Sequence, residues 1–189
     1  MKTRQIEKAD FDQIVEVIDH WWGGPISTFA HPIFFYELGA EALMAEVDGQ
    51  MIGFLLGFIA DRPHGLDRVK SEAMPPLGPT RMSTTDVGRT GYVHLVGIHP
   101  EYRRRGVGRL LYHQFTGACR EAGCDAMKAI TTIGNEGSLR FHLAVGWTAA
   151  EDDNYAGSAR KRVVFTRDLH SGRVSPVPHT AVLSAAKIG

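Results

Sequence analysis

Hydrophobic and polar residues alternate with two different periods along the chain, and the order of these periods predicts a mixed α/β protein. Residues 2–6 have the pattern of a short edge strand. Asp10 is of a residue type that caps helices, and apolar residues recur after it at helical spacing up to Trp22, where a Gly-Gly-Pro run ends the helix. A shorter helical patch is expected at 31–38.

The next predicted unit is a hairpin. Two apolar runs, 42–47 and 51–60, flank Asp48 and Gly49, and an Asp-Gly pair between such runs is a strong hairpin signal. Residues 61–89 are then rich in Pro, Gly, Ser, Thr and Met, which predicts a long loop. Such a loop either shapes a site or is a solvated insertion, and the sequence leaves both open.

Strands and helices continue to alternate in the second half of the chain. Pro100 ends an apolar strand, Gly123 stops the next helix, and Asn135 and Gly146 bound a shorter helix as its N-cap and C-cap. The last stretch has no clear period and is expected to be a flexible tail. The expected strands are 90–99, 126–133 and 162–169, the helices are 108–121 and 138–145, and the tail is 170–189.

Composition restricts the class of protein. The 189 residues are 43% hydrophobic, which suits one domain with a sizeable core. The 21 Lys and Arg residues balance 21 Asp and Glu residues, so no overall field favours nucleic acid or an anionic membrane. The N-terminus lacks a signal-peptide pattern, no apolar run has membrane-span length, and Cys119 and Cys124 suit neither zinc nor a disulfide framework. We therefore expect a soluble, cytoplasmic protein without a metal.

A basic turn stands between the strand that Pro100 ends and the helix after it. Gly106 and Gly108 let the backbone turn tightly with its N–H groups inward, and the positive end of the helix dipole follows. The spacing excludes a P-loop and a dinucleotide fingerprint. Taken alone, the pattern fits a phosphate-binding turn and a solvated basic turn equally well. The arginines of the turn are Arg103, Arg104, Arg105 and Arg109.

Two motifs in the right order decide between these interpretations. Arg103, Gly106 and Gly108 fit the signature Q/R-x-x-G-x-G/A, and here the chain resembles the GCN5-related N-acetyltransferase (GNAT) superfamily. The run from Asn135 to Trp147 resembles that family's N-x-x-A/S-x-x-L/F-Y-x-x-x-G-F/W helix. The resemblance implies an α/β fold with a mostly antiparallel twisted sheet of about six to seven strands, flanked by helices and splayed at the acetyl-CoA site. It implies a single N-acetyltransferase domain over 1–169.

The resemblance also implies acetyl-CoA as co-substrate. Strand backbone would bond the pantetheine arm, the basic turn would wrap the pyrophosphate, and the helix after Asn135 would meet CoA. Independently of the family, Gly97 inside a strand indicates a bulge or a close backbone approach. The residues implied in cofactor binding are Val96, Gly97, Ile98, Arg103, Arg104, Arg105, Gly106, Val107, Gly108, Arg109, Asn135 and Ser138.

Two histidines are the catalytic candidates. His142 stands where the family often has a tyrosine that protonates the leaving thiolate, and histidine can act as such an acid; a packed helix residue is the alternative. His94, on the strand before the basic turn, is the best candidate for the base that deprotonates the amine, with a structural cross-strand residue as its alternative. No motif places a base beside either cysteine, and direct transfer needs no covalent intermediate.

The resemblance thus implies an N-acetyltransferase that moves acetyl from acetyl-CoA directly to a primary amine of a small molecule, peptide or protein in a ternary complex. Because His142 replaces the tyrosine, a CoA-binding sensory or partner-binding domain without turnover is the alternative. The identity of the amine is open, and so is a homodimer. Nucleic-acid binding by residues 103–105 has little support, since no second basic stripe accompanies them.

Overall fold

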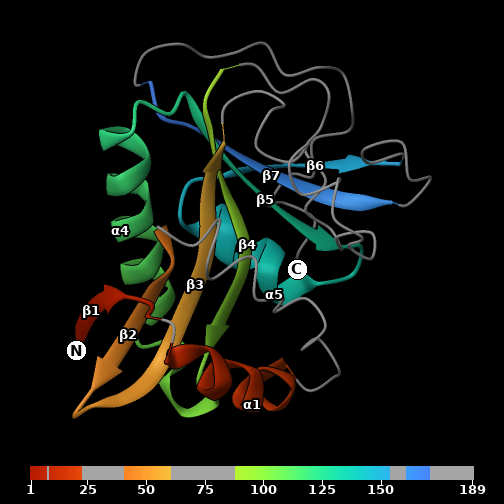
Figure 1. Ribbon diagram of the computed structural model, residues 1–189. Helices are drawn as coiled ribbons and strands as arrows, with labels where there is room; N and C mark the ends of the chain where they lie inside the picture. Colours follow the sequence, from red (N-terminus) through yellow and green to blue (C-terminus); the bar gives the residue numbers. More distant parts are fainter. Residues whose placement is uncertain (8, 23–40, 61–87, 154–160, 171–189) are drawn as a thin grey trace, which may run out of the picture. The chain divides into compact units, whose positions relative to one another are not determined.

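The structure is a computed structural model that describes most of the chain (Figure 1). The helical patch expected at 31–38, nearly all of the long loop and nearly all of the tail lie outside the described residues. Contacts divide the chain into two compact units, 1–59 with 91–123 and 60–90 with 124–189. The expectation of one domain over 1–169 stays a prediction. The described residues are 1–7, 9–22, 41–60, 88–153 and 161–170.

The first unit is built on four neighbouring strands in the order β1-β2-β3-β4, of which β1 is the edge strand, as expected. The pairs β1–β2 and β2–β3 are antiparallel. Asp48 and Gly49 have φ of 51° and 77°, which gives the two-residue turn that the Asp-Gly signal predicts. The elements are β1 (Lys2–Gln5), α1 (Asp10–Trp22), β2 (Leu43–Val47), β3 (Gln50–Ala60), β4 (Thr90–Ile98), the 3₁₀ turn η3 (Pro100–Tyr102) and α4 (Val107–Glu121).

Helices α1 and α4 pack on opposite faces of β3. Phe54 and Leu56 belong to the core cluster that contains the apolar face of α1. Gly53 and Gly57, on either side of these two residues in the strand, are approached instead by Val107 and Phe115 of α4. Because side chains alternate between the faces of a strand, these two sets lie on opposite sides of the sheet. The missing side chains at the two glycines let α4 approach the strand closely.

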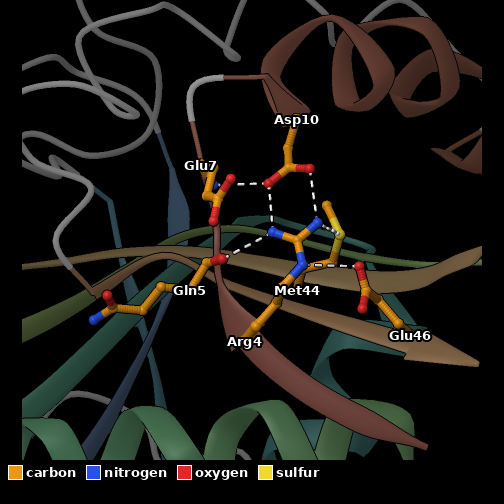
Figure 2. Close-up of polar contacts among 6 residues, drawn as sticks. All are labelled: Arg4, Gln5, Glu7, Asp10, Met44 and Glu46. Carbon is orange, nitrogen blue, oxygen red and sulfur yellow. Dashed lines mark hydrogen bonds and ion pairs between the residues drawn. The ribbon is translucent and has the colours of Figure 1, made fainter. Parts of the chain in front are cut away.

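A single guanidinium links the start of α1 to the first two strands (Figure 2). Arg4 donates to both carboxylate oxygens of Asp10, at 2.6 and 2.8 Å, and to Glu46 of β2 at 2.8 Å. The guanidinium lowers the pKa of Asp10. Asp10 also accepts the backbone N–H of Glu7 at 2.7 Å, so its carboxylate bonds the incoming chain, whereas the sequence predicts a bond to the first helical turn.

The second unit contains an antiparallel β5-β7-β6 arrangement and one helix. The predicted N-cap of α5 is confirmed, because Asn135 accepts the N–H of Ser138 at 3.1 Å. The C-cap is Val145 and not Gly146, which follows it in the left-handed region with φ of 84°. With the first unit, the described residues hold seven strands flanked by helices, which confirms the α/β fold class. The elements are β5 (Ala126–Thr132), α5 (Glu136–Ala144), β6 (Thr148–Asp152) and β7 (Arg162–Asp168).

Adding a methyl group at Gly53 should destabilise the first unit. A Cβ there would lie 2.8 Å from Cγ1 of buried Val107 and 3.1 Å from the Gly97 carbonyl oxygen. We expect Gly53→Ala to lower the free energy of unfolding by about 1–2 kcal/mol, because the stiff Val107 side chain and the strand must both shift.

Urea denaturation measures this change, with Gly117→Ala as the matched control. A Cβ at Gly117 meets nothing within 4 Å. In the interior of α4 this substitution should stabilise the protein by about 0.5–1 kcal/mol. Equal stability of the two variants would contradict the close approach at Gly53.

Candidate acetyl-CoA site

The basic turn is shaped by two residues in the left-handed backbone region. Arg104 has φ of 60° and Gly106 has φ of 86°. Before them, the His99 N–H bonds to the Ile52 carbonyl at 3.0 Å, which fixes the end of β4 to β3. Helix α4 starts directly after Gly106, and Val107, only 2% exposed, anchors that start in the core. The turn therefore has a rigid base and an exposed rim.

The N-terminus of α4 suits an anion. Its N-cap residue is Gly106, which has no side chain to cap the first-turn N–H groups. Uncapped N–H groups and the helix dipole together favour a bound phosphate. The rim residues Arg104, Arg105 and Arg109 are exposed and add positive charge. Thus the residues present fit the pyrophosphate of acetyl-CoA.

The arginines of the turn do not all make the same contacts. The Arg105 guanidinium lies 5.4 Å from the centre of the Tyr102 ring, in a cation–π arrangement. Arg103 bonds to the protein backbone: Nη2 donates to the Trp21 carbonyl and Nε to the Ile98 carbonyl at 3.4 Å. The assignment of Arg103 to the cofactor stays a prediction, and its observed partners are protein carbonyls.

The strand β4 contributes the other expected cofactor contacts. Gly97 is buried, and Val96 and Ile98 are half-buried. The Gly97 carbonyl oxygen would lie 3.1 Å from a Cβ at Gly53 of β3, and the bulge or close backbone approach expected at Gly97 itself stays a prediction. Bonds from this strand to the pantetheine arm stay a prediction.

The histidines of β4 and the following turn differ in their surroundings. His94 is 7% exposed, and its role as base stays a prediction. His99 is the N-cap of η3: its Nδ1 accepts the Glu101 N–H at 3.3 Å. Its ring meets Trp21 edge-on at 5.4 Å and Tyr102 at 5.6 Å. His99 is therefore held as a structural residue.

His142 is packed in an aromatic cluster in the second unit. Its ring stacks on Phe165 of β7 at 3.9 Å with an interplanar angle of 6°, and Phe141 and Trp147 meet it edge-on. Burial lowers the pKa of His142 to about 4, although the hydrogen bond to Ser138 opposes that shift. Nδ1 lies 2.8 Å from the Ser138 carbonyl oxygen and therefore donates its proton there. This environment favours a neutral, structural ring.

The other two predicted residues, at the start of α5, are engaged in local hydrogen bonds. Asn135 Nδ2 donates to Thr131 Oγ1 at 2.9 Å, while its oxygen caps the helix. Ser138 supplies the N–H of that cap and the carbonyl that holds His142. The assignment of Asn135 and Ser138 to CoA stays a prediction.

Sequence reasoning missed the contacts that Tyr102 and Trp21 make with the turn. Tyr102 directly precedes the three arginines, and this adjacency could have predicted a cation–π contact between the ring and a guanidinium. The contact of Arg103 with Trp21 involves a backbone carbonyl far away in sequence. Because every residue has a backbone carbonyl, no sequence pattern indicates which one will accept a hydrogen bond.

Comparisons with known proteins show the family of the chain. The model of the acetyltransferase (GNAT) family matches residues 11–147, well over half of the chain, and the chain belongs to this family. It is therefore an acetyltransferase with acetyl-CoA as co-substrate. No curated protein matches the chain in sequence. Among the described residues, no helix is long and apolar enough to cross a membrane.

Solved structures of acetyltransferases share the fold. Naa20 of Chaetomium thermophilum with a bisubstrate analogue is 16% identical, with a TM-score of 0.62 over 89% of this chain and 86% of that chain. Arabidopsis thaliana NAA60 with acetyl-CoA is 15% identical, with a TM-score of 0.61 over 88% and 98%. The ribosomal-protein-S18-alanine N-acetyltransferase of Escherichia coli is 12% identical, with a TM-score of 0.61 over 93% and 98%. At these identities the likeness establishes the fold.

Proposed function

We propose that the chain is an N-acetyltransferase that moves acetyl from acetyl-CoA directly to a primary amine in a ternary complex. The observation that carries this proposal is the uncapped start of α4, with Gly106 in the left-handed region and exposed arginines around it. It supports binding of the donor through its pyrophosphate. A bisubstrate analogue, the ligand of the Naa20 structure, is a ligand type suited to direct transfer.

The buried cysteines support direct transfer over a covalent intermediate. Cys119 and Cys124 are 0% and 2% exposed, so neither thiol is accessible to a thioester in the described structure. In direct transfer the amine lone pair attacks the thioester carbonyl, the C–S bond breaks, and the CoA thiolate leaves. The nitrogen loses one proton as the amide forms, which balances the negative charge of the thiolate. The amine must be neutral to attack, and we assign its deprotonation to His94 of β4.

Peptides with free N-termini are the first acceptors to test. One of the fold relatives, the ribosomal-protein-S18-alanine N-acetyltransferase of Escherichia coli, is named for acetylating a protein chain. The assay measures thiol release from acetyl-CoA with a panel of such peptides, lysine peptides and small amines, and mass spectrometry identifies the acetylated product. We expect at least one amine to raise thiol release well above hydrolysis and to gain one acetyl group.

The alternative function is a CoA-binding sensor without turnover, which the buried His142 in place of tyrosine favours. Calorimetric binding of CoA together with no amine-dependent thiol release across the panel would support the sensor. Absence of CoA binding would contradict both functions.

A further inference from the structure

The Arg103 side chain connects the start of the basic turn to the far end of α1. Trp21, whose carbonyl accepts from Arg103 Nη2, lies in the last turn of α1, and Ile98, whose carbonyl accepts from Nε, ends β4. All three residues belong to the first unit. Two of the guanidinium's donor groups are therefore directed at the protein backbone.

The end of α1 is a favourable place for this cation. The last carbonyls of a helix lack intrahelical partners and carry the negative end of the helix dipole. The only basic residue of α1 in that turn is His20. A fully charged guanidinium donating to the Trp21 carbonyl satisfies one of these groups and offsets the dipole.

Ring contacts reinforce the same connection. The Trp21 ring is 4% exposed, stacks on Phe54 at 5.9 Å and meets His99 edge-on. His99 in turn meets Tyr102, and Tyr102 lies under Arg105. A continuous set of contacts thus runs from the last turn of α1 to the exposed rim of the basic turn.

We propose that Arg103 is a positioning residue: it binds the C-terminal turn of α1 and couples the order of that turn to occupancy of the basic turn by CoA. The phosphate charge is then met by the α4 N-terminus and the other arginines. This inference rests on the proposed donor site. A phosphate bound at residues 104–109 restricts the backbone next to Arg103. The hydrogen bond from Arg103 to α1 is then formed for a larger fraction of the time.

Three variants separate hydrogen bonding from charge. Arg103→Lys keeps the charge and can donate, Arg103→Gln can donate without charge, and Arg103→Met does neither. Arg109→Gln, on the exposed rim, is the comparison variant for loss of a phosphate contact. All four proteins are compared as full-length chains.

Calorimetric titration with CoA at two salt concentrations tests whether the charge of Arg103 contributes to CoA binding. We expect Arg109→Gln to weaken CoA binding about tenfold at low salt and to reduce its salt dependence, because a screened charge–charge contact is lost. Arg103→Gln should keep the salt dependence of the parent. A salt dependence reduced as far as in Arg109→Gln would identify Arg103 as a phosphate ligand and overturn the proposal.

Hydrogen exchange rates of the backbone amides at 18–22 test whether Arg103 holds the last turn of α1 in place. Without CoA, Arg103→Met should raise their exchange rates several-fold, and Arg103→Lys and Arg103→Gln should largely restore them. CoA should slow this exchange in the parent, Arg103→Lys and Arg103→Gln, but not in Arg103→Met. Unchanged exchange in Arg103→Met, or equal slowing by CoA in all proteins, would overturn the inference. If the parent bound no CoA, the proposed CoA site would be wrong. The exchange rates without CoA would still show whether Arg103 holds the end of α1.

Discussion

His142→Phe should leave the rate of acetyl transfer within about threefold of the parent rate. It should also make the free energy of unfolding less sensitive to acid. Phe reproduces the flat ring that stacks on Phe165, and it removes only the titratable nitrogens. A CoA thiolate can leave without a strong acid beside it, since thiols have a pKa of about 8.5. A fall in kcat of thirtyfold or more, with unchanged CoA affinity, would restore His142 as the acid.

The acid sensitivity follows from the direction of the pKa shift. The folded protein holds the pKa of His142 at about 4, below the value of 6.5 for an exposed imidazole. Between these values the unfolded chain binds more protons than the folded one, so the free energy of unfolding falls as pH drops from 6.5 towards 4. The total loss is about 3 kcal/mol, at 1.36 kcal/mol for each pH unit.

Urea denaturation at several pH values between 7.5 and 4 measures this loss. His142→Phe should flatten the profile in that window by about 3 kcal/mol relative to the parent. Asp10, whose pKa is lowered, loses its stabilising charge only as pH falls below the usual carboxyl range, so the two effects occupy separate windows. Parallel profiles of parent and variant would contradict the buried, neutral histidine.

Gly106→Asp should weaken CoA binding by about a hundredfold or more. A negative charge at the N-cap of α4 would repel the pyrophosphate, and an aspartate oxygen would cap the N–H groups that the phosphate needs. The backbone at φ of 86° adds strain for any residue with a Cβ. Calorimetry of CoA and the acetyl-CoA KM both measure the effect.

Gly123→Asp is the matched control for that substitution. Gly123 has φ of 74°, follows the other end of α4, and also has nothing within 4 Å of an added Cβ. The control should carry a similar backbone strain, and we expect its CoA affinity to stay within about threefold of the parent. A comparable loss in both variants would show that strain, and not charge at the site, weakens binding.

The local signals in the sequence were sufficient for most elements of the fold. The Asp48-Gly49 turn, the cap by Asn135 and the break at Gly123 are each set by residues within a few positions, and all three are confirmed. The strand β6 (TAAED) was missed because it has no β-branched run or aromatic residue beyond one threonine. Its pairing with β7 determines its structure.

The parts of the site that depend on residues close together in sequence could be predicted, and the parts that depend on distant residues could not. The basic turn could be recognised because Gly106 and its arginines are adjacent in sequence. The environment of His142 could not, because this residue of α5 stacks on Phe165 of β7, which is distant in sequence. The direction of Arg103 could not either, since both of its partners are backbone carbonyls, which every residue possesses.

The Arg4 contacts affect how the protein can be handled in the laboratory. Trimming the first five residues would remove the cation that pairs with both Asp10 and Glu46, and would leave these carboxylates close to one another without it. An added N-terminal tag leaves the cation in place, provided that β1 still pairs with β2. Affinity tags left at this end are therefore safer than protease sites that cut into it.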